Sequence, residues 1–164
     1  MSLISAPEFQ KRLADLPLAT YQAGQTVFAA GSKTGLLLIL KSGAVAIIKE
    51  AVEIAKVVEP GSVFGEMSAL LGEPHTVEVR AVENSQFHVA DAAMVMQDPV
   101  SLLYIATVMA RRLEVTNEAL YELKSQLKEG QPAEAVSKTL RQIEELLNDG
   151  GAAPPGKRRF FVKR

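Results

Sequence analysis

Residues 59–77 hold the side chains with the clearest potential for chemistry. Gly65 has no side chain, so the backbone there lets a ligand approach closely. The residues from Glu66 to Leu71 are expected to form one or two helical turns whose first backbone N–H groups point outward and attract a phosphate. A carboxylate beside an anion is repulsive unless it accepts a hydrogen bond from a neutral donor, such as a sugar hydroxyl. Gly65 and Glu66 together therefore predict a site for a sugar phosphate.

Other residues resemble known chemical motifs, but structural roles explain them better. Residues 31–35, Gly-Ser-Lys-Thr-Gly, lack the full spacing of a phosphate-binding loop and lie between expected strands, so they predict a turn. His75 and His88 are too few to hold a metal ion. No nucleophile and base stand at a credible spacing. The sequence thus predicts no catalytic residue, no metal site and no cofactor, and the protein is expected not to be an enzyme.

The elements that position residues 59–77 are expected to be short β-strands. Apolar runs bounded by turn residues follow one another from Thr20 to Ala90, which is typical of a β-roll or sandwich. The expected strands are Val27–Ala30, Leu36–Lys41, Ala44–Lys49, Ile54–Val58, Val77–Val82 and Gln86–Ala90. In the fifth of these, the odd-numbered residues are expected to face inward and Arg80 outward, away from the site. A short helix over Pro7–Leu16 is expected before the strands, because apolar residues recur there at helical spacing.

A long helix is expected after the strands. Asp98 and Pro99 indicate its start, with Asp98 as the N-cap and the proline at the first helical position. Its first half has a wide apolar stripe and is expected to pack on the strands. Its second half has a seam at coiled-coil spacing, formed by Met109, Leu113, Thr116, Leu120, Leu123 and Leu127. This seam predicts a homodimer through residues 109–127.

The last part of the chain is expected to form a tail. Its apolar spacing predicts an amphipathic helix over about 133–148. Linker-like residues follow, and residues 157–164 carry five basic side chains around two aromatic ones. Those residues either contact nucleic acid, an acidic partner or a membrane surface, or form a disordered solubilising end. The chain is therefore divided into a domain over 1–130, with its long helix at about 99–128, and a tail over 131–164.

The composition limits the class of protein. The length of 164 residues suits one domain, and the net charge of -1 gives no overall positive field toward nucleic acid. The absence of cysteine excludes disulfides and thiolate metal sites. No apolar run approaches the roughly 20 residues of a membrane span, and the first residues lack the apolar core of a signal peptide. A cytoplasmic protein without a membrane span is expected.

These residues resemble the cyclic nucleotide-binding domains. The cassette of that family reads approximately Phe-Gly-Glu, two or three residues, Ala-Leu-Leu, a short spacer, and Pro-Arg with a hydroxyl residue. Residues 64–66, 69–71 and 74–76 match it at that spacing. The resemblance covers roughly residues 18–128 and implies a mainly β fold, a β-roll or jelly roll, with a long C-terminal dimerisation helix.

Residues 109–116 of the long helix, Met-Ala-Arg-Arg-Leu-Glu-Val-Thr, resemble the dimer helix of the bacterial catabolite activator branch of this family. In that branch the helix forms the subunit interface and offers a hydroxyl to the adenine ring, which falls on Thr116 here, with Asn117 beside it. The resemblance implies cyclic AMP or cyclic GMP as the ligand. The ligand-binding residues that it implies are Phe64, Gly65, Glu66, Met67, Ala69, His75, Thr76, Thr116 and Asn117.

His75 stands where the family has an arginine. Arginine gives the cyclic phosphate a permanent positive charge and two parallel N–H donors. An accessible imidazole with a pKa near ~6.5 is mostly neutral at pH 7 and offers one donor. A charge-assisted hydrogen bond contributes roughly 1.5–3 kcal/mol, so the exchange is expected to weaken binding on the order of 100-fold or more.

Two functions of different classes remain open. The first is a dimeric regulatory sensor that binds a cyclic nucleotide weakly or atypically. The second is a degenerate homologue that binds no nucleotide and serves as a scaffold for dimerisation and protein interaction. A third possibility is that His75 contacts an anion more strongly below about pH 6, where the imidazole is charged. The 37 residues after Leu127 are too few for a winged helix-turn-helix, so no DNA-binding domain is expected, and the output is assigned to the dimer, the tail or an unknown protein partner.

Overall fold

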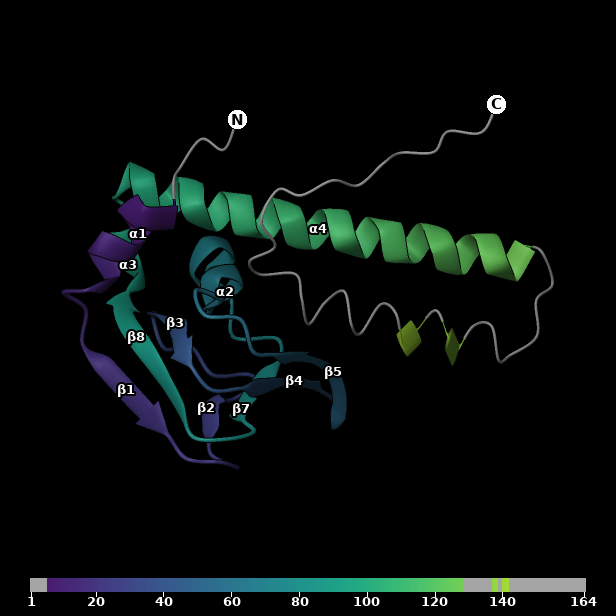
Figure 1. Ribbon diagram of the computed structural model, residues 1–164, viewed down its shortest axis with the longest axis horizontal. Helices are drawn as coiled ribbons and strands as arrows, with labels where there is room; N and C mark the ends of the chain where they lie inside the picture. Colours follow the sequence, from purple (N-terminus) through teal and green to yellow (C-terminus); the bar gives the residue numbers. More distant parts are fainter. Residues whose placement is uncertain (1–5, 129–136, 139, 142–164) are drawn as a thin grey trace.

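Two four-stranded antiparallel sheets form a β-roll in the computed structural model, which describes residues 6–128, 137, 138, 140 and 141 (Figure 1). Sheet A has the strand order β1-β8-β3-β6 and sheet B the order β2-β7-β4-β5. The strands of sheet A are β1 (Leu18–Tyr21), β3 (Leu36–Ser42), β6 (Val63–Phe64) and β8 (Ser85–Asp91). Those of sheet B are β2 (Thr26–Phe28), β4 (Val45–Lys49), β5 (Val52–Val57) and β7 (Glu78–Ala81). The predicted mainly β fold is confirmed.

Four helices accompany the roll: α1 (Ala6–Leu13), α2 (Glu66–Leu71), α3 (Ala92–Val95) and α4 (Pro99–Lys128). Helix α4 starts beside α1 and α3, passes over α2 and extends beyond the roll (Figure 1). The predicted start of α4 is confirmed, because the backbone N–H of Ser101 donates to the Asp98 carboxylate at 3.0 Å. None of the helices in the described part of the chain is both long and apolar enough to cross a membrane.

Strand β3 separates two layers of apolar packing. Its residues Leu38 and Leu40 face sheet B and pack in a cluster that includes Phe87. Leu37 and Ile39 point the other way, into a second cluster formed with α1, α3 and α4. Both faces of this strand are covered, which explains why its sequence is a continuous apolar run rather than an alternating one. Sheet A is therefore the wall between the roll interior and the helical layer.

The six predicted strands are all present, with ends shifted by up to two residues, but β1, β6 and α3 were not predicted. Strand β6 has only two residues and is defined by its pairing with β3, as in the pair Leu38 and Phe64. Helix α1 ends at Leu13, earlier than expected, because Pro17 disfavours a helical conformation at Leu16. The predicted helix over 133–148 lies largely outside the described residues, and residues 157–164 lie wholly outside them.

The turn between β4 and β5 places two residues with side chains in the left-handed region, Glu50 at φ 50° and Ala51 at φ 66°. This conformation costs a residue with a Cβ roughly 1–2 kcal/mol, and glycine largely escapes that cost. We therefore expect Ala51→Gly to raise the free energy of unfolding by about 1 kcal/mol, measured by urea denaturation. Ala55→Gly, within β5, is the control and should destabilise the protein. Equal losses in both variants would contradict the strain argument.

Candidate ligand-binding site

Gly65 connects β6 to α2 and fixes where the helix begins. It is the N-cap residue of α2, with φ 90°, and a Cβ placed there would lie 2.6 Å from the carbonyl oxygen of Leu36. Only glycine fits both the positive φ and the closed space. Gly72, with φ 69°, is the C-cap residue after Leu71, and the Ser68 hydroxyl donates to the carbonyl of Glu73 at 2.5 Å. The helix predicted for this segment is thus present, with both ends defined.

The carboxylate of Glu66 is buried against α4. It accepts a hydrogen bond from the Arg112 guanidinium and forms an ion pair with it, and the two side chains are 8% and 33% exposed. The same guanidinium donates to the carbonyl oxygen of Val63 at 2.8 Å. Arg112 therefore connects α4 to the strand before α2 and to the first residue of α2.

The imidazole of His75 lies inside the site. It is 8% exposed, stacks on Phe28 with ring centroids 4.3 Å apart, and its Nε2 is 3.1 Å from the Thr34 hydroxyl. Burial lowers the pKa of His75, and the nearby charge of Glu66 offsets only part of that effect. The expectation of an accessible imidazole with an ordinary pKa is wrong, because Phe28 and Thr34 enclose the ring. The ring is neutral at pH 7.

Residues 31–35 form the predicted turn, and this turn holds the segment that carries His75. The backbone N–H of Gly31 donates to the carbonyl of His75 at 2.7 Å, and the N–H of His75 donates to the carbonyl of Ser32 at 2.8 Å. The Lys33 ammonium donates to the carbonyl of Gly72 at 2.7 Å. These bonds hold the main chain at His75 and at Gly72 before it, and so fix the position of the imidazole.

Cavities lie on two sides of α2. One, of about 60 Å³, is lined by residues of the cassette and by Phe28. The other, of about 360 Å³, is lined by residues that include Lys33, Ala69 and Asp91. Ligand pockets usually have volumes of roughly 300–1,000 Å³, so the cassette cavity is too small for a cyclic nucleotide as it stands. Among the residues that the structure describes, no group of three or more potential ligands could hold a metal ion.

The structure brings five of the nine predicted site residues to the cassette cavity: Gly65, Glu66, Met67, His75 and Thr76. Phe64 is buried in the core between the sheets, and Ala69 lines the larger cavity instead. Thr116 and Asn117 are exposed on α4 and line neither cavity. The Thr116 hydroxyl donates to the carbonyl of Arg112 at 2.8 Å, within its own helix.

Arg80 does not replace the missing arginine. Two of its guanidinium nitrogens contact one oxygen of Glu78, each at 2.8 Å, and its side chain is 47% exposed. It does not line the cassette cavity. Its outward orientation in β7 is as predicted.

Sequence reasoning missed the three residues that define the environment of the site, namely Phe28, Thr34 and Arg112. Only Arg112 had a usable signal, because it lies three residues after Met109 and four before Thr116, on the same face of α4 as the predicted seam. Phe28 and Thr34 belong to β2 and to the following turn, and nothing in their local pattern relates them to His75.

The comparison with protein families decides the class of this site. The sequence model of the cyclic nucleotide-binding domain matches residues 18–97, the segment that contains the roll and the cassette. This part of the chain belongs to the cyclic nucleotide-binding domain family. No curated protein sequence matches the chain.

Solved structures share the fold of this cyclic nucleotide-binding domain. The catabolite activator protein of Thermus thermophilus is 21% identical, with a TM-score of 0.58 over 94% of this chain and 89% of that one. PKAR CBD2 bound to Sp-2Cl-cAMPS is 21% identical, with a TM-score of 0.57 over 80% of this chain and 84% of that one. The regulatory domain of Toxoplasma gondii PKA with cAMP is 18% identical, with a TM-score of 0.56 over 65% of this chain and 43% of that one. At these identities the likeness is one of fold.

The lowered pKa of His75 predicts that acid destabilises the domain. A group with a lower pKa in the folded than in the unfolded chain binds fewer protons when folded. The free energy of unfolding then falls as the pH drops through the unfolded value of about 6.5. His88, whose pKa is lowered by burial and then by the charge of Lys41, acts in the same direction, whereas Asp98 titrates at lower pH.

We therefore expect the urea midpoint of the wild type to decrease when the pH is lowered from 7 to 5. The urea midpoint of His75→Gln should decrease less over the same range. His88→Gln is the matched variant for the other imidazole whose pKa is lowered, which is partly buried. An unchanged pH dependence in both variants would refute the assignment of this loss to the two histidines.

Proposed function

We propose that the chain is a dimeric regulatory module that binds cyclic AMP or cyclic GMP weakly, because His75 replaces the arginine that holds the cyclic phosphate. The observation that carries this proposal is the state of the imidazole: neutral, buried on Phe28, and in contact with Thr34. The phosphate end of the site therefore has no fixed positive charge from this position. The structurally similar regulatory domain of Toxoplasma gondii PKA, solved with cAMP, supports the ligand class.

The proposed ligand would meet its remaining partners around α2. Glu66 would accept a hydrogen bond from a sugar hydroxyl, and Thr76 would donate its hydroxyl to the phosphate. Helix α2 has free volume of about 360 Å³ on its other side. A shift of α2 into that space would enlarge the cassette cavity, and through the Glu66–Arg112 ion pair it would change the position of α4.

The exposed seam of α4 supports the proposed dimer. Leu113 is 60% exposed and Leu120 is 49% exposed, although both lie at positions of coiled-coil spacing. Apolar side chains in one row on a helix are expected to be covered by a second helix. Thr116 lies in the same row, so a dimer would place it and Asn117 at the interface.

A second candidate function is a scaffold that binds no nucleotide. The observation that favours it is the cassette cavity of about 60 Å³, which has no room for a cyclic nucleotide without movement of α2. The domain would then serve for dimerisation and protein interaction.

Calorimetric titration with cyclic AMP and cyclic GMP separates the two functions. We expect weak binding by the wild type and about 100-fold tighter binding by His75→Arg. Val82→Arg, which adds the same charge at an exposed position outside the cassette cavity, is the control and should bind like the wild type. No heat with millimolar ligand in either the wild type or His75→Arg would overturn the sensor and leave the scaffold.

A further inference from the structure

A third cavity, of about 230 Å³, lies in the helical layer on the far side of sheet A from the roll interior. Its wall is formed by α1, by α3, by the start of α4 and by strands of sheet A. None of its lining residues lines either cavity beside α2. It is therefore a separate space, and the function proposed above makes no use of it.

The interior of this cavity is apolar. The lining includes Leu13, Leu37, Ile39, Ala90 and Ile105, all of them buried core residues. An engineered cavity of about 150 Å³ with a similar lining stays dry and binds benzene. The present cavity is larger and has room for an apolar ligand longer than benzene. Helix α1 forms one side of this cavity and also packs on α4, where Phe9 stacks on Tyr104 with ring centroids 3.7 Å apart.

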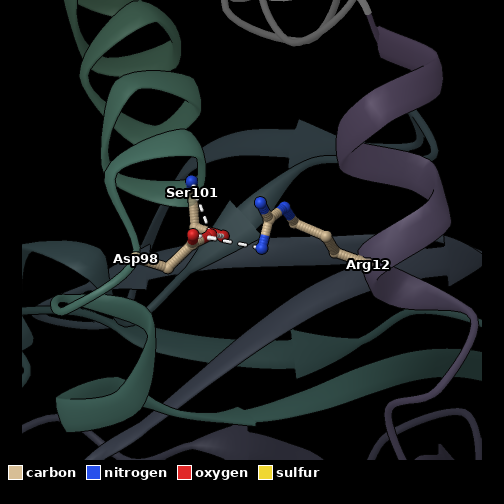
Figure 2. Close-up of polar contacts among 3 residues, drawn as sticks. All are labelled: Arg12, Asp98 and Ser101. Carbon is tan, nitrogen blue, oxygen red and sulfur yellow. Dashed lines mark hydrogen bonds and ion pairs between the residues drawn. The ribbon is translucent and has the colours of Figure 1, made fainter.

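Polar side chains gather at one end of this cavity, where α1 meets the start of α4. Figure 2 shows Arg12 reaching from α1 toward Asp98 and Ser101. The Arg12 guanidinium is 3.1 Å from the Asp98 carboxylate. The other oxygen of Asp98 accepts from the backbone N–H of Ser101 at 3.0 Å and from its hydroxyl at 2.5 Å.

The hydrogen bonds of this cluster leave donors in excess. Both oxygens of Asp98 already have a partner, and the hydroxyl and the backbone N–H of Ser101 both donate to Asp98. Arg12 has five N–H donors, and its contact with Asp98 uses one nitrogen. Its side chain is 48% exposed, so the guanidinium can turn toward a second acceptor. The charge of Asp98 is balanced by Arg12 and by the N-terminus of α4.

We infer that this cavity is a second ligand site, for a small aliphatic carboxylate whose chain fills the apolar space and whose head group binds Arg12. A carboxylate has only acceptors and matches the planar fork of a guanidinium. Such a ligand would touch α1, sheet A and the first turns of α4 at once. It would therefore stabilise α1 in its docked position and act on the first turns of α4, whereas Glu66 of the cassette contacts α4 further along, at Arg112.

Titration of the full chain with hexanoate, octanoate and decanoate tests the apolar part of this inference. Each added methylene is expected to tighten binding about fourfold until the cavity is full. Methyl NMR of the wild type should show the largest shift changes at Leu13, Leu16 and Val95, which line the cavity. Absence of binding with millimolar decanoate, or shift changes centred on α2, would overturn the site.

Two variants test the head group and the cavity separately. Arg12→Gln should weaken octanoate at least about tenfold and leave the binding of 1-octanol unchanged, whereas Arg80→Gln, on sheet B, should change neither. Ala90→Leu should fill the cavity and abolish binding of both compounds. Equal loss of octanoate and octanol in Arg12→Gln would refute the carboxylate, and the methyl shifts of the wild type decide the site even if Ala90→Leu fails to fold.

Discussion

Replacing Arg112 by methionine is expected to lower the free energy of unfolding by about 3 kcal/mol. The substitution keeps most of the side-chain volume but leaves the Glu66 carboxylate, 8% exposed, without its cation. Removing one partner of a buried ion pair costs roughly 3–5 kcal/mol, because the remaining charge is removed from water and has no opposite charge beside it. Arg112 itself is 33% exposed, which places the expected loss at the lower end. The carbonyl of Val63 loses a donor as well.

Urea denaturation of four variants measures this effect and assigns it. Arg111→Met, at the exposed neighbouring position, should change stability by less than about 0.5 kcal/mol. Glu66→Gln should cost less than Arg112→Met, because the amide oxygen can still accept from the guanidinium. The double variant should lose less than the sum of the two single losses, since each removes the same interaction. Additive losses would mean that Glu66 and Arg112 do not stabilise each other.

The parts of the site that were predictable from the sequence are local ones. Gly65, Glu66 and the short helix that follows are fixed by a turn, a helix start and their spacing within one segment. The Arg112 contact joins residues 46 positions apart, and no periodic pattern encodes such a distance. Spacing alone predicts on which face of α4 Arg112 lies. The residue that Arg112 contacts depends on where the roll places α2.

The environment of His75 could not be predicted for the same reason. Its position in the cassette follows from the sequence, and so does the loss of the arginine charge. Its burial depends on Phe28 in β2 and on Thr34 in the turn that follows, and both are brought to it by the closure of the roll. That closure changed the expected imidazole from an accessible group to an enclosed neutral one, and it strengthens the argument for weak binding of an anion.

The strands that went unpredicted show a related limit. β6 has two residues, too few for any alternation, and exists because β3 supplies its hydrogen-bond partners. β1 is largely exposed, so its burial pattern is weak. Strand β3, in contrast, was predictable at almost its full length because its apolar run is covered on both faces.

Gly65→Ala is expected to lower the free energy of unfolding by about 2–5 kcal/mol. Two costs add at this position. The residue has φ 90°, which a residue with a Cβ adopts at a cost of roughly 1–2 kcal/mol. The new methyl group would also lie 2.6 Å from the carbonyl oxygen of Leu36 and 3.3 Å from the Phe28 ring, and such overpacking costs roughly 1–3 kcal/mol. Because Phe28 stacks on His75, the strain falls on the ligand site itself.

Gly72→Ala, at the other end of α2, separates the two costs. Gly72 has φ 69°, and a Cβ there meets nothing within 4 Å, so this variant carries the conformational cost alone. We expect its loss in urea denaturation to be about 1–2 kcal/mol, and the difference between the variants to measure the contact with Leu36 and Phe28. Gly65→Ala should also broaden or shift the NMR signals of His75, while Gly72→Ala should not. Equal losses in the two variants would show that the backbone at Leu36 yields to the methyl group, and that α2 can move where the proposed ligand requires it to.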